Sequence, residues 1–347
     1  MASRRHVTAG GLKIGGGAPV SVQSMTTTQT SDIPETISQI NRLEALGCDI
    51  IRVAASDFAS ADAIAKLKEH VKIPIVADVH FDYRLALRSV EAGADKLRIN
   101  PGNIGSADNI RAIADICLKK SVPVRIGVNS GSISEEILAK YGGVTPEAMF
   151  RSAMEHVRLL NLYDFDDICI SVKTSSVPLT IAAYRMLADH TDYPLHLGIT
   201  EAGTEYSGLV KSSVGIGALL ADGIGDTIRV SLTAPPESEV KAGIAILRAL
   251  NLREGYQLIS CPTCGRCKID LISLAEMVDR RLENLGKNLV VAVMGCAVNG
   301  PGEASRADYG IAGADDYGVI FAKGKVIARA PMDTLVEELF SVIESEE

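Results

Sequence analysis

Short apolar runs alternate with amphipathic segments along the first 250 residues of the chain. Each run is rich in Val, Ile and Leu and almost continuously apolar, which is typical of parallel strands buried on both faces. The segments between the runs have a helical period, as at Ile33, Ile37, Ile40 and Leu43. The eight runs span residues 19–25, 49–54, 73–80, 96–100, 122–129, 167–173, 194–200 and 227–232.

Eight strand–helix units within about 250 residues predict an α/β protein with a (β/α)8 TIM barrel. An open doubly wound sheet is the alternative, but no nucleotide-binding fingerprint follows the first strand. The Gly-rich stretch 10–17 precedes that strand, so we expect a hairpin closing the bottom of the barrel rather than a phosphate loop. The longest predicted loop, 130–145, follows the fifth strand, and loops of that length are usually functional.

The pattern changes after Leu250, where a second and smaller domain begins. It contains a helical pattern at 271–285, a strongly apolar strand at 289–294, short strands near Gly310, Val319 and Val326, and a closing helix at 335–343. We therefore predict two domains, a substrate-binding TIM barrel at 1–250 and a small α+β domain at 251–347.

Charge and composition exclude several classes of protein. Lys and Arg number 35 against 43 Asp and Glu, so a net charge of −8 argues against a general nucleic-acid binder. The longest uncharged apolar stretch, 289–298, is too short to cross a bilayer, and no apolar secretion signal follows the N-terminus. Seven cysteines, an odd number, in a chain of 347 residues suit a reducing compartment. We expect a cytoplasmic protein without a membrane or nucleic-acid partner.

Basic residues interrupt five of the apolar strands. A charge inside a barrel strand is costly unless it is paired or faces solvent, and one buried ion pair would account for one such residue but not for five. Because active sites of barrels lie at the carboxyl ends of the strands, these cations are expected to converge there on a compact ligand with several negative charges, such as a diphosphate or, less favoured, a carboxylate. The five residues are Arg52, Arg98, Arg125, Lys173 and Arg229.

Other polar residues lie at or near the strand ends. His80, Asn129 and Ser231 are candidates for hydrogen bonds to the same ligand, although a single histidine at a strand end is more often structural. Glu201, on the loop after the seventh strand, is the candidate general acid or base. Asp78 is expected to orient a neighbouring arginine or histidine.

The cysteines fall into two groups. Cys48, Cys117 and Cys169 lie within helical or strand patterns and are expected to be small buried apolar residues. Cys-x-x-Cys spacing in the second domain is compatible with a redox disulfide, a zinc site or an iron–sulfur cluster. Zinc is disfavoured because a second Cys-x-x-Cys pair is missing. This second group is Cys261, Cys264, Cys267 and Cys296.

The chain resembles the 4-hydroxy-3-methylbut-2-enyl diphosphate synthase family of the non-mevalonate isoprenoid pathway, in its bacterial two-domain form. The match covers essentially the whole chain, and its last two motifs together are highly specific. The motifs are 19–26 (PVSVQSMT), 77–81 (ADVHF), 97–102 (LRINPG), 124–131 (VRIGVNSG), 196–203 (HLGITEAG), 260–266 (SCPTCGR) and 299–303 (NGPGE).

The resemblance implies a [4Fe-4S] cluster held by Cys261, Cys264, Cys296 and Glu303 in the second domain. Cys267 is not needed by the family pattern and would compete as a ligand. The implied reaction is the reductive opening of 2-C-methyl-D-erythritol 2,4-cyclodiphosphate, with electrons from a reduced ferredoxin or flavodoxin. The strand cations would hold the diphosphate, and Glu201 would deliver a proton.

The length of the linker points to a dimer. In a barrel the eighth helix returns to the bottom, so the chain leaves near Leu250, away from the mouth. About ten residues reach at most roughly 35 Å, whereas a barrel with its helices is about 40 Å across. We therefore predict a head-to-tail homodimer in which the cluster domain of each chain closes over the partner's barrel, as the resemblance also implies.

Two other classes of function remain open. One is a barrel enzyme acting on another phosphorylated metabolite, with a purely structural zinc domain. The other is a non-enzymatic carrier or scaffold for a cluster, for which five convergent cations would serve no purpose.

Overall fold

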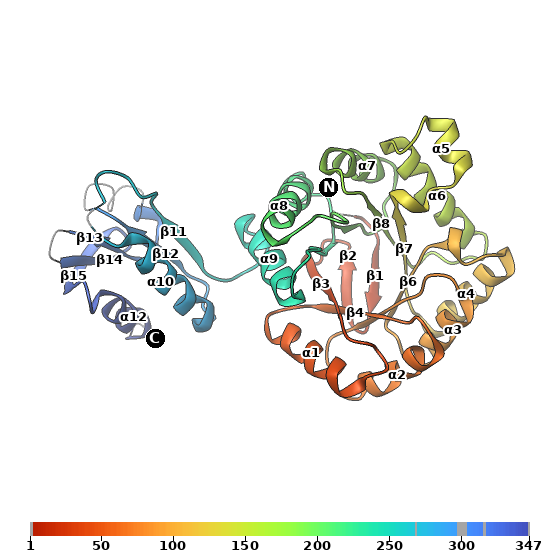
Figure 1. Ribbon diagram of the computed structural model, residues 1–347, viewed down its shortest axis with the longest axis horizontal. Coiled ribbons are helices and arrows are strands. Elements are labelled where there is room, and N and C mark those ends of the chain that lie inside the picture. The colour runs from red at the N-terminus through yellow and green to blue at the C-terminus, as the bar shows by residue number, and fades with distance from the viewer. Residues whose placement is uncertain (1–2, 268, 297–303, 315–316, 346–347) are drawn as a thin grey trace. The chain divides into compact units, whose positions relative to one another are not determined.

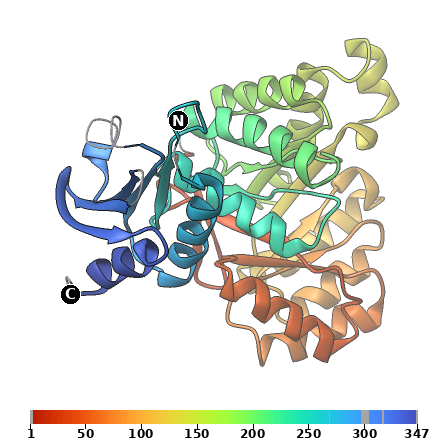
Figure 2. The same ribbon diagram turned by 60° about the vertical axis from the view of Figure 1, so that its left-hand side comes forward.

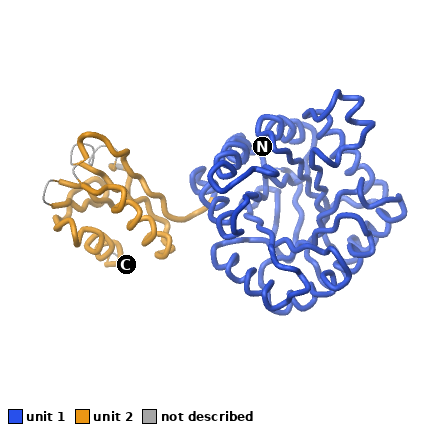
Figure 3. Tube along the Cα trace, viewed as in Figure 1, with its two compact units in different colours: residues 1–252 blue, residues 253–347 orange. Residues whose placement is uncertain are grey.

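A computed structural model describes residues 3–267, 269–296, 304–314 and 317–345. The chain divides into two compact units, residues 1–252 and 253–347, and each is described by itself (Figure 3).

Unit 1 is a parallel eight-stranded barrel surrounded by helices (Figure 1). Neighbouring strands follow the order β8-β7-β6-β5-β4-β3-β10-β9, and a parallel bridge between Ile170 and Leu195 joins the two remaining edges. The strands are β3 (Ser21–Met25), β4 (Ile50–Ala54), β5 (Ile75–Asp78), β6 (Lys96–Ile99), β7 (Val124–Asn129), β8 (Ile168–Lys173), β9 (His196–Leu197) and β10 (Thr227–Ile228). Each lies within one of the eight apolar runs, so the predicted barrel is confirmed.

The helices of unit 1 cover the outside of the barrel. They are α1 (Ile33–Ala45), α2 (Phe58–Lys68), α3 (Tyr83–Glu91), α4 (Ala107–Lys120), α5 (Glu135–Tyr141), α6 (Pro146–Asn161), α7 (Val177–His190), α8 (Glu205–Ala221) and α9 (Pro236–Ala249), with the 3-10 turns η1 (Pro101–Asn103) and η2 (Ser130–Ser132). The segment predicted as a loop at 130–145 therefore contains η2 and α5. Ser134 caps α5 by accepting a hydrogen bond from the Ile137 amide, and Gly142 ends it in the left-handed conformation.

A hairpin of β1 (His6–Ala9) and β2 (Leu12–Gly15) precedes the barrel. Its turn uses Gly10 and Gly11, both at positive φ. Val7, Ala9 and Ile14 pack against Ile50 and Val76 inside the barrel, far from the carboxyl ends of the strands. The hairpin expected at the bottom of the barrel is thus confirmed.

Unit 2 contains a five-stranded mixed sheet in the order β11-β12-β13-β14-β15. The first three strands are parallel, and the last two pairings are antiparallel. Helices α10 and α12 pack their apolar sides on one face of the sheet (Figures 1 and 2). The elements are β11 (Gln257–Ser260), α10 (Leu271–Leu285), β12 (Val290–Met294), η3 (Ala304–Arg306), β13 (Tyr309–Gly313), β14 (Tyr317–Ala322), β15 (Lys325–Pro331) and α12 (Leu335–Ser345).

Candidate active site

A cavity of about 210 Å³ opens at the carboxyl ends of the barrel strands. All eight residues predicted to bind the ligand line it: Arg52, His80, Arg98, Arg125, Asn129, Lys173, Arg229 and Ser231. One cation from each of β4, β6, β7 and β8 lines the cavity, and Arg229 follows β10. The structure therefore brings the strand cations together in one place.

Asp78, at the end of β5, is the one carboxylate among the described residues that lines this cavity. Arg98 Nη1 donates a hydrogen bond of 3.1 Å to Asp78 Oδ1, and Arg52 Nε lies 3.8 Å from Oδ2. His80 Nε2 lies 3.4 Å from the same Oδ2. Burial would raise the pKa of Asp78, but Arg52, His80 and Arg98 outweigh it and hold that pKa well below its ordinary value. Asp78 thus stays ionised and orients three side chains, as expected.

Arg125 and Lys173 are cations with buried side chains. No carboxylate of the described residues lies within ion-pair distance of either side chain. Burial, together with the charge of Arg98, lowers the pKa of Arg125 to about 10. Burial, together with four neighbouring arginines, sets the pKa of Lys173 well below its ordinary value. An anion in the cavity would therefore relieve an unfavourable concentration of positive charge.

Arg229 is paired from outside the cavity. Its Nη2 lies 3.4 Å from Oε2 of Glu239, a buried residue of α9. Glu239 Oε1 also accepts a hydrogen bond of 2.9 Å from the Leu232 amide. Through Glu239, helix α9 positions both the Arg229 side chain and the segment that carries Ser231.

Several residues of the site were missed by the sequence analysis. Gln23 Oε1 accepts a 3.4 Å hydrogen bond from Arg125 Nη1, and Met25 Sδ accepts one of 2.9 Å from Arg52 Nη2. A Cβ added at Gly127 would lie 2.5 Å from Arg98 Nε, so the absence of a side chain there makes room for the arginine. Ser171 and Thr200 complete the lining. A signal existed for Gly127, since glycine inside an apolar strand often marks a close approach.

Glu201 does not line the cavity. It is exposed on the loop after β9 and has a φ of 52°, in the left-handed region that a side chain seldom adopts. The structure thus places the candidate general acid or base on the mouth side of the barrel but outside the ring of cations.

Two cysteines of unit 2 lie just after the carboxyl ends of two adjacent parallel strands. Cys261 follows β11 directly, and Cys296 lies two residues after β12. The Gly295 amide donates a 3.2 Å hydrogen bond to Cys261 Sγ, and a Cβ added at Gly295 would lie 2.7 Å from Cys267 Sγ. Two thiols therefore reach the turn that carries Cys296. Cys48, Cys117 and Cys169 are buried, as expected.

The ligand set itself is not assembled in the part of the chain that the structure describes. There, no three His, Cys, Asp or Glu side chains are grouped to hold a metal ion, and Cys264 is exposed. Glu303, the fourth expected ligand, lies outside the described residues. The donor chemistry fits a thiolate-held centre, because soft sulfur ligands suit iron–sulfur clusters and zinc.

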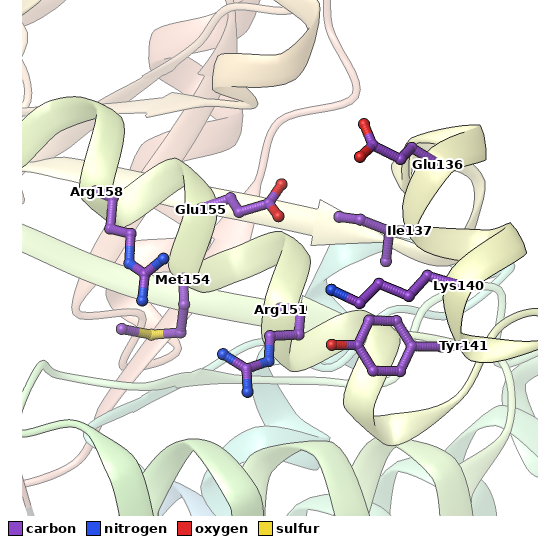
Figure 4. Close-up of a pocket in the computed structure, with 8 residues that line it drawn as sticks. All are labelled: Glu136, Ile137, Lys140, Tyr141, Arg151, Met154, Glu155 and Arg158. Carbon is purple, nitrogen blue, oxygen red and sulfur yellow. The ribbon is translucent and has the colours of Figure 1, made fainter.

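A second cavity, of about 280 Å³, lies between α5 and α6 (Figure 4). Side chains of the two helices face one another there, among them Lys140, Arg151, Glu136 and Glu155. These residues are exposed and carry charges of both signs. Within the described residues, no helix is long and apolar enough to cross a membrane.

A parallel barrel with a cationic cavity at its mouth, joined to a small cysteine-bearing unit, defines a two-domain barrel enzyme. The GcpE TIM-barrel domain matches residues 4–244, and the GcpE protein C-terminal domain matches residues 257–345. The chain belongs to the GcpE family, which confirms the resemblance drawn from its motifs.

Curated relatives cover nearly the whole chain. A 4-hydroxy-3-methylbut-2-en-1-yl diphosphate synthase (flavodoxin) from Caldanaerobacter subterraneus is 58% identical over 341 residues, 98% of this chain and 96% of its own. A protein of the same name from Ruminiclostridium cellulolyticum is 54% identical over 340 residues, again 98% of this chain and 96% of its own.

Solved structures with lower identity share the barrel. Dihydropteroate synthase from Stenotrophomonas maltophilia aligns with a TM-score of 0.53 at 13% identity, covering 71% of this chain and 97% of its own. Type I 3-dehydroquinate dehydratase from Clostridium difficile aligns with a TM-score of 0.52 at 14% identity and the same coverage. At such identities these matches show the fold alone.

Proposed function

We propose that this protein reduces 2-C-methyl-D-erythritol 2,4-cyclodiphosphate to 4-hydroxy-3-methylbut-2-enyl diphosphate. The reaction takes up two electrons and two protons, breaks the C2–O bond of the ring and releases the C3 oxygen as water. The observation that carries the proposal is the mouth cavity, where five cations face one carboxylate. The names of the relatives agree with it.

The chain's own residues would bind and orient the substrate. Arg125 and Lys173, which lack a carboxylate partner among the described residues, are the groups most favoured to pair with the diphosphate. Arg52 and Arg98 are held by Asp78, and Arg229 is held by Glu239, so their guanidinium groups are positioned before the substrate arrives. His80, Asn129 and Ser231 lie at the rim of the same cavity and add hydrogen bonds.

Cys261, Cys264, Cys296 and Glu303 would hold a [4Fe-4S] cluster, which supplies single electrons and an iron that a weak carboxylate ligand leaves accessible. Support comes from the Gly295 amide directed at Cys261 Sγ, since hydrogen bonds to ligand sulfurs tune such centres. Cys267, close to Gly295, would remain outside the ligand set and pack beside it.

Glu201 would deliver a proton to the departing oxygen. Its exposed position leaves it open to solvent, from which it can be reprotonated after each turnover. Electrons would come from reduced flavodoxin, the reductant in the names of the relatives, or from a ferredoxin. All of this chemistry suits the reducing cytoplasm.

Anaerobic metal and sulfide analysis, followed by turnover of the cyclic diphosphate, tests the proposal. We expect about four iron and four sulfide per chain, and formation of the allylic diphosphate with a reduced flavodoxin system. One zinc per chain without sulfide would instead indicate a structural metal domain. A normal cluster without turnover would indicate a carrier.

The cluster domain would act on the barrel of a second copy, because the chain leaves α9 at the bottom of its own barrel. Mixing Arg98→Ala chains with Cys296→Ala chains tests this arrangement. Each variant alone should be inactive, and the mixture should recover up to about a quarter of wild-type activity, since half of the chains pair unlike and each such pair has one intact site. No recovery after subunit exchange would indicate closure within one chain.

A further inference from the structure

Lys96 is a further cation on a barrel strand, and the mouth site leaves it without a role. It lies on β6 two residues before Arg98, so its side chain faces the barrel interior about 7 Å nearer the bottom. Lys96 is fully buried and does not line the mouth cavity. It therefore holds a charge inside the barrel that a ligand in the mouth cannot contact directly.

The surroundings of Lys96 separate it from the solvent below the barrel. Its partner in register on β5 is Val76, which packs with the hairpin of β1 and β2 that closes the bottom. Cys169, from β8, belongs to the same apolar cluster and lies beside Lys96. Arg98 is the next residue of β6 that faces the interior, and it lines the mouth cavity. Lys96 thus occupies the layer between the apolar bottom cluster and the ring of cations.

No carboxylate neutralises Lys96 directly. Among the residues that the structure describes, none lies within ion-pair distance of its Nζ, although Asp167 favours its charged form from farther away. Burial lowers the pKa of Lys96, the Cys169 thiol opposes this shift, and the charge of Arg125 adds to it. Burial, with the charges of Arg125 and Lys96 among others, sets the pKa of His196 well below its ordinary value. The field of Lys96 therefore reaches other groups of the barrel interior.

This placement of a lysine is unfavourable for folding. A buried cation without a carboxylate partner is costly, and an apolar side chain of similar volume is often neutral or stabilising at such a position. A methionine would pack against Val76 and Cys169 without bringing a charge into the interior. Folding alone therefore does not explain the lysine, so its explanation lies in what the barrel binds.

The proposed reaction creates negative charge next to this layer. In the cyclic diphosphate each phosphorus atom carries one ionisable oxygen, so the ligand has two negative charges. Cleavage of the C2–O bond leaves a terminal phosphate with a second ionisable oxygen, and a second pKa of about 6 for phosphate monoesters gives the linear product close to three charges. Of the two protons taken up, one leaves in the water, and the other is released again when this oxygen ionises.

We infer that Lys96 is a specificity-determining residue, whose buried charge favours the linear diphosphate, and the bond cleavage that forms it, over the bound cyclic diphosphate. A charge in an interior of low dielectric acts over several ångströms, so contact with the ligand is not needed. Cations that touch the ligand hold both diphosphates, whereas a charge behind them acts on each in proportion to its own charge. This inference rests on the proposed function and adds a basis for its selectivity.

Calorimetric titration of the anaerobic holoenzyme, without a reductant, tests the inference. A charge roughly 10 Å away, in a medium between protein and water, should change affinity about threefold for each negative charge of the ligand. We therefore expect Lys96→Met to raise the dissociation constant of the cyclic diphosphate about ninefold and that of the linear diphosphate about 30-fold. The ratio of the two constants should thus change about threefold. An unchanged ratio would overturn the inference.

Two further variants separate charge from structure. Lys96→Gln, which is also uncharged, should change the ratio in the same direction. Lys140→Met, on the exposed surface of α5, is the matched control and should leave both dissociation constants unchanged. The urea unfolding midpoint of Lys96→Met should stay the same or rise, because a buried unpaired cation is removed. Failure of both Lys96 variants to fold would overturn the inference, because it would make Lys96 a structural residue.

The outcomes also separate the role of Lys96 from the reaction. If the wild type converts the cyclic diphosphate but Lys96→Met leaves the ratio unchanged, the inference fails alone. If the ratio changes as expected but the wild type with a full cluster does not convert the cyclic diphosphate, the proposed reaction fails alone. Conversion by the wild type together with the changed ratio supports both.

Discussion

Volume and burial of charge rank the mouth cavity and the α5–α6 cavity in opposite orders. The α5–α6 cavity is larger, at about 280 Å³ against 210 Å³. Its charged side chains, including Lys140, Arg151 and Glu155, come from two surface helices and are exposed (Figure 4). The mouth cavity is instead lined by five cations, which come from five strands or strand ends, and by one carboxylate of the described residues.

This difference makes burial of unbalanced charge a better reason than volume for choosing the mouth cavity as the candidate site. Exposed charges of both signs are solvated, so they change the free energy of unfolding little in either direction. Buried cations that lack a partner are unfavourable in the free protein, so their cost is offset only where a ligand supplies the missing negative charge. Three substitutions test this contrast, in order of decreasing expected effect.

Asp78→Asn should destabilise the fold by about 3–5 kcal/mol, because it leaves Arg52 and Arg98 buried without their carboxylate. Urea unfolding at neutral pH measures the change in the free energy of unfolding. Glu155→Gln, in the exposed α5–α6 cavity, is the matched control and should change it by less than about 0.5 kcal/mol. Equal effects of the two substitutions would remove the distinction between the cavities.

Arg125→Met should lower kcat/KM for the cyclic diphosphate by about 10²- to 10³-fold, since a buried charge contact to the ligand is lost. The unfolding midpoint should stay the same or rise, because an unpaired buried cation is replaced by an apolar side chain of similar length. Arg151→Met should change kcat/KM less than about twofold, since a surface substitution away from the site has little effect. An unchanged kcat/KM in Arg125→Met would contradict the assignment of the mouth cavity.

Two histidines extend the comparison to pH. His156 of α6 is buried beneath η1, where a Cβ added at Gly102 would lie 3.0 Å from its ring, and burial lowers its pKa to about 4. The unfolded chain binds this proton below about pH 6.5, so the neutral ring should cost the fold up to about 3 kcal/mol as the pH falls from 6.5 to 4. His190, which lines a cavity adjoining that of Figure 4, is exposed.

Urea unfolding at pH 7, 5.5 and 4 measures the effect as a difference from the wild type. His156→Leu should lose less stability than the wild type between pH 6.5 and 4. His190→Gln, which removes an exposed ring, is the control measured over the same range. A His156→Leu curve parallel to that of the wild type would show that the ring is not held neutral.

The sequence predicted the barrel because strands buried on both faces leave apolar runs that need no knowledge of their neighbours. It also predicted the cations of the mouth, because a charge inside a buried strand needs a partner or a ligand, and the carboxyl ends of barrel strands meet at one mouth. Gln23 and Met25 were missed because they are recognised only by their contacts with Arg125 and Arg52, which lie on other strands. Helix α5 was taken for part of a loop because its seven residues are too few for a clear period.

The sequence by itself determined the number of strands, which strands carry a cation and which loops carry the cysteines, because each of these is a local pattern. Tertiary structure decided that Asp78 neutralises Arg52 and Arg98, while Arg125 and Lys173 are left without a carboxylate among the described residues. It also decided that Gly217 is open on the outside of α8, whereas Gly215 is closed against Ile199. These outcomes depend on distances between elements, and such distances are fixed only when the barrel closes.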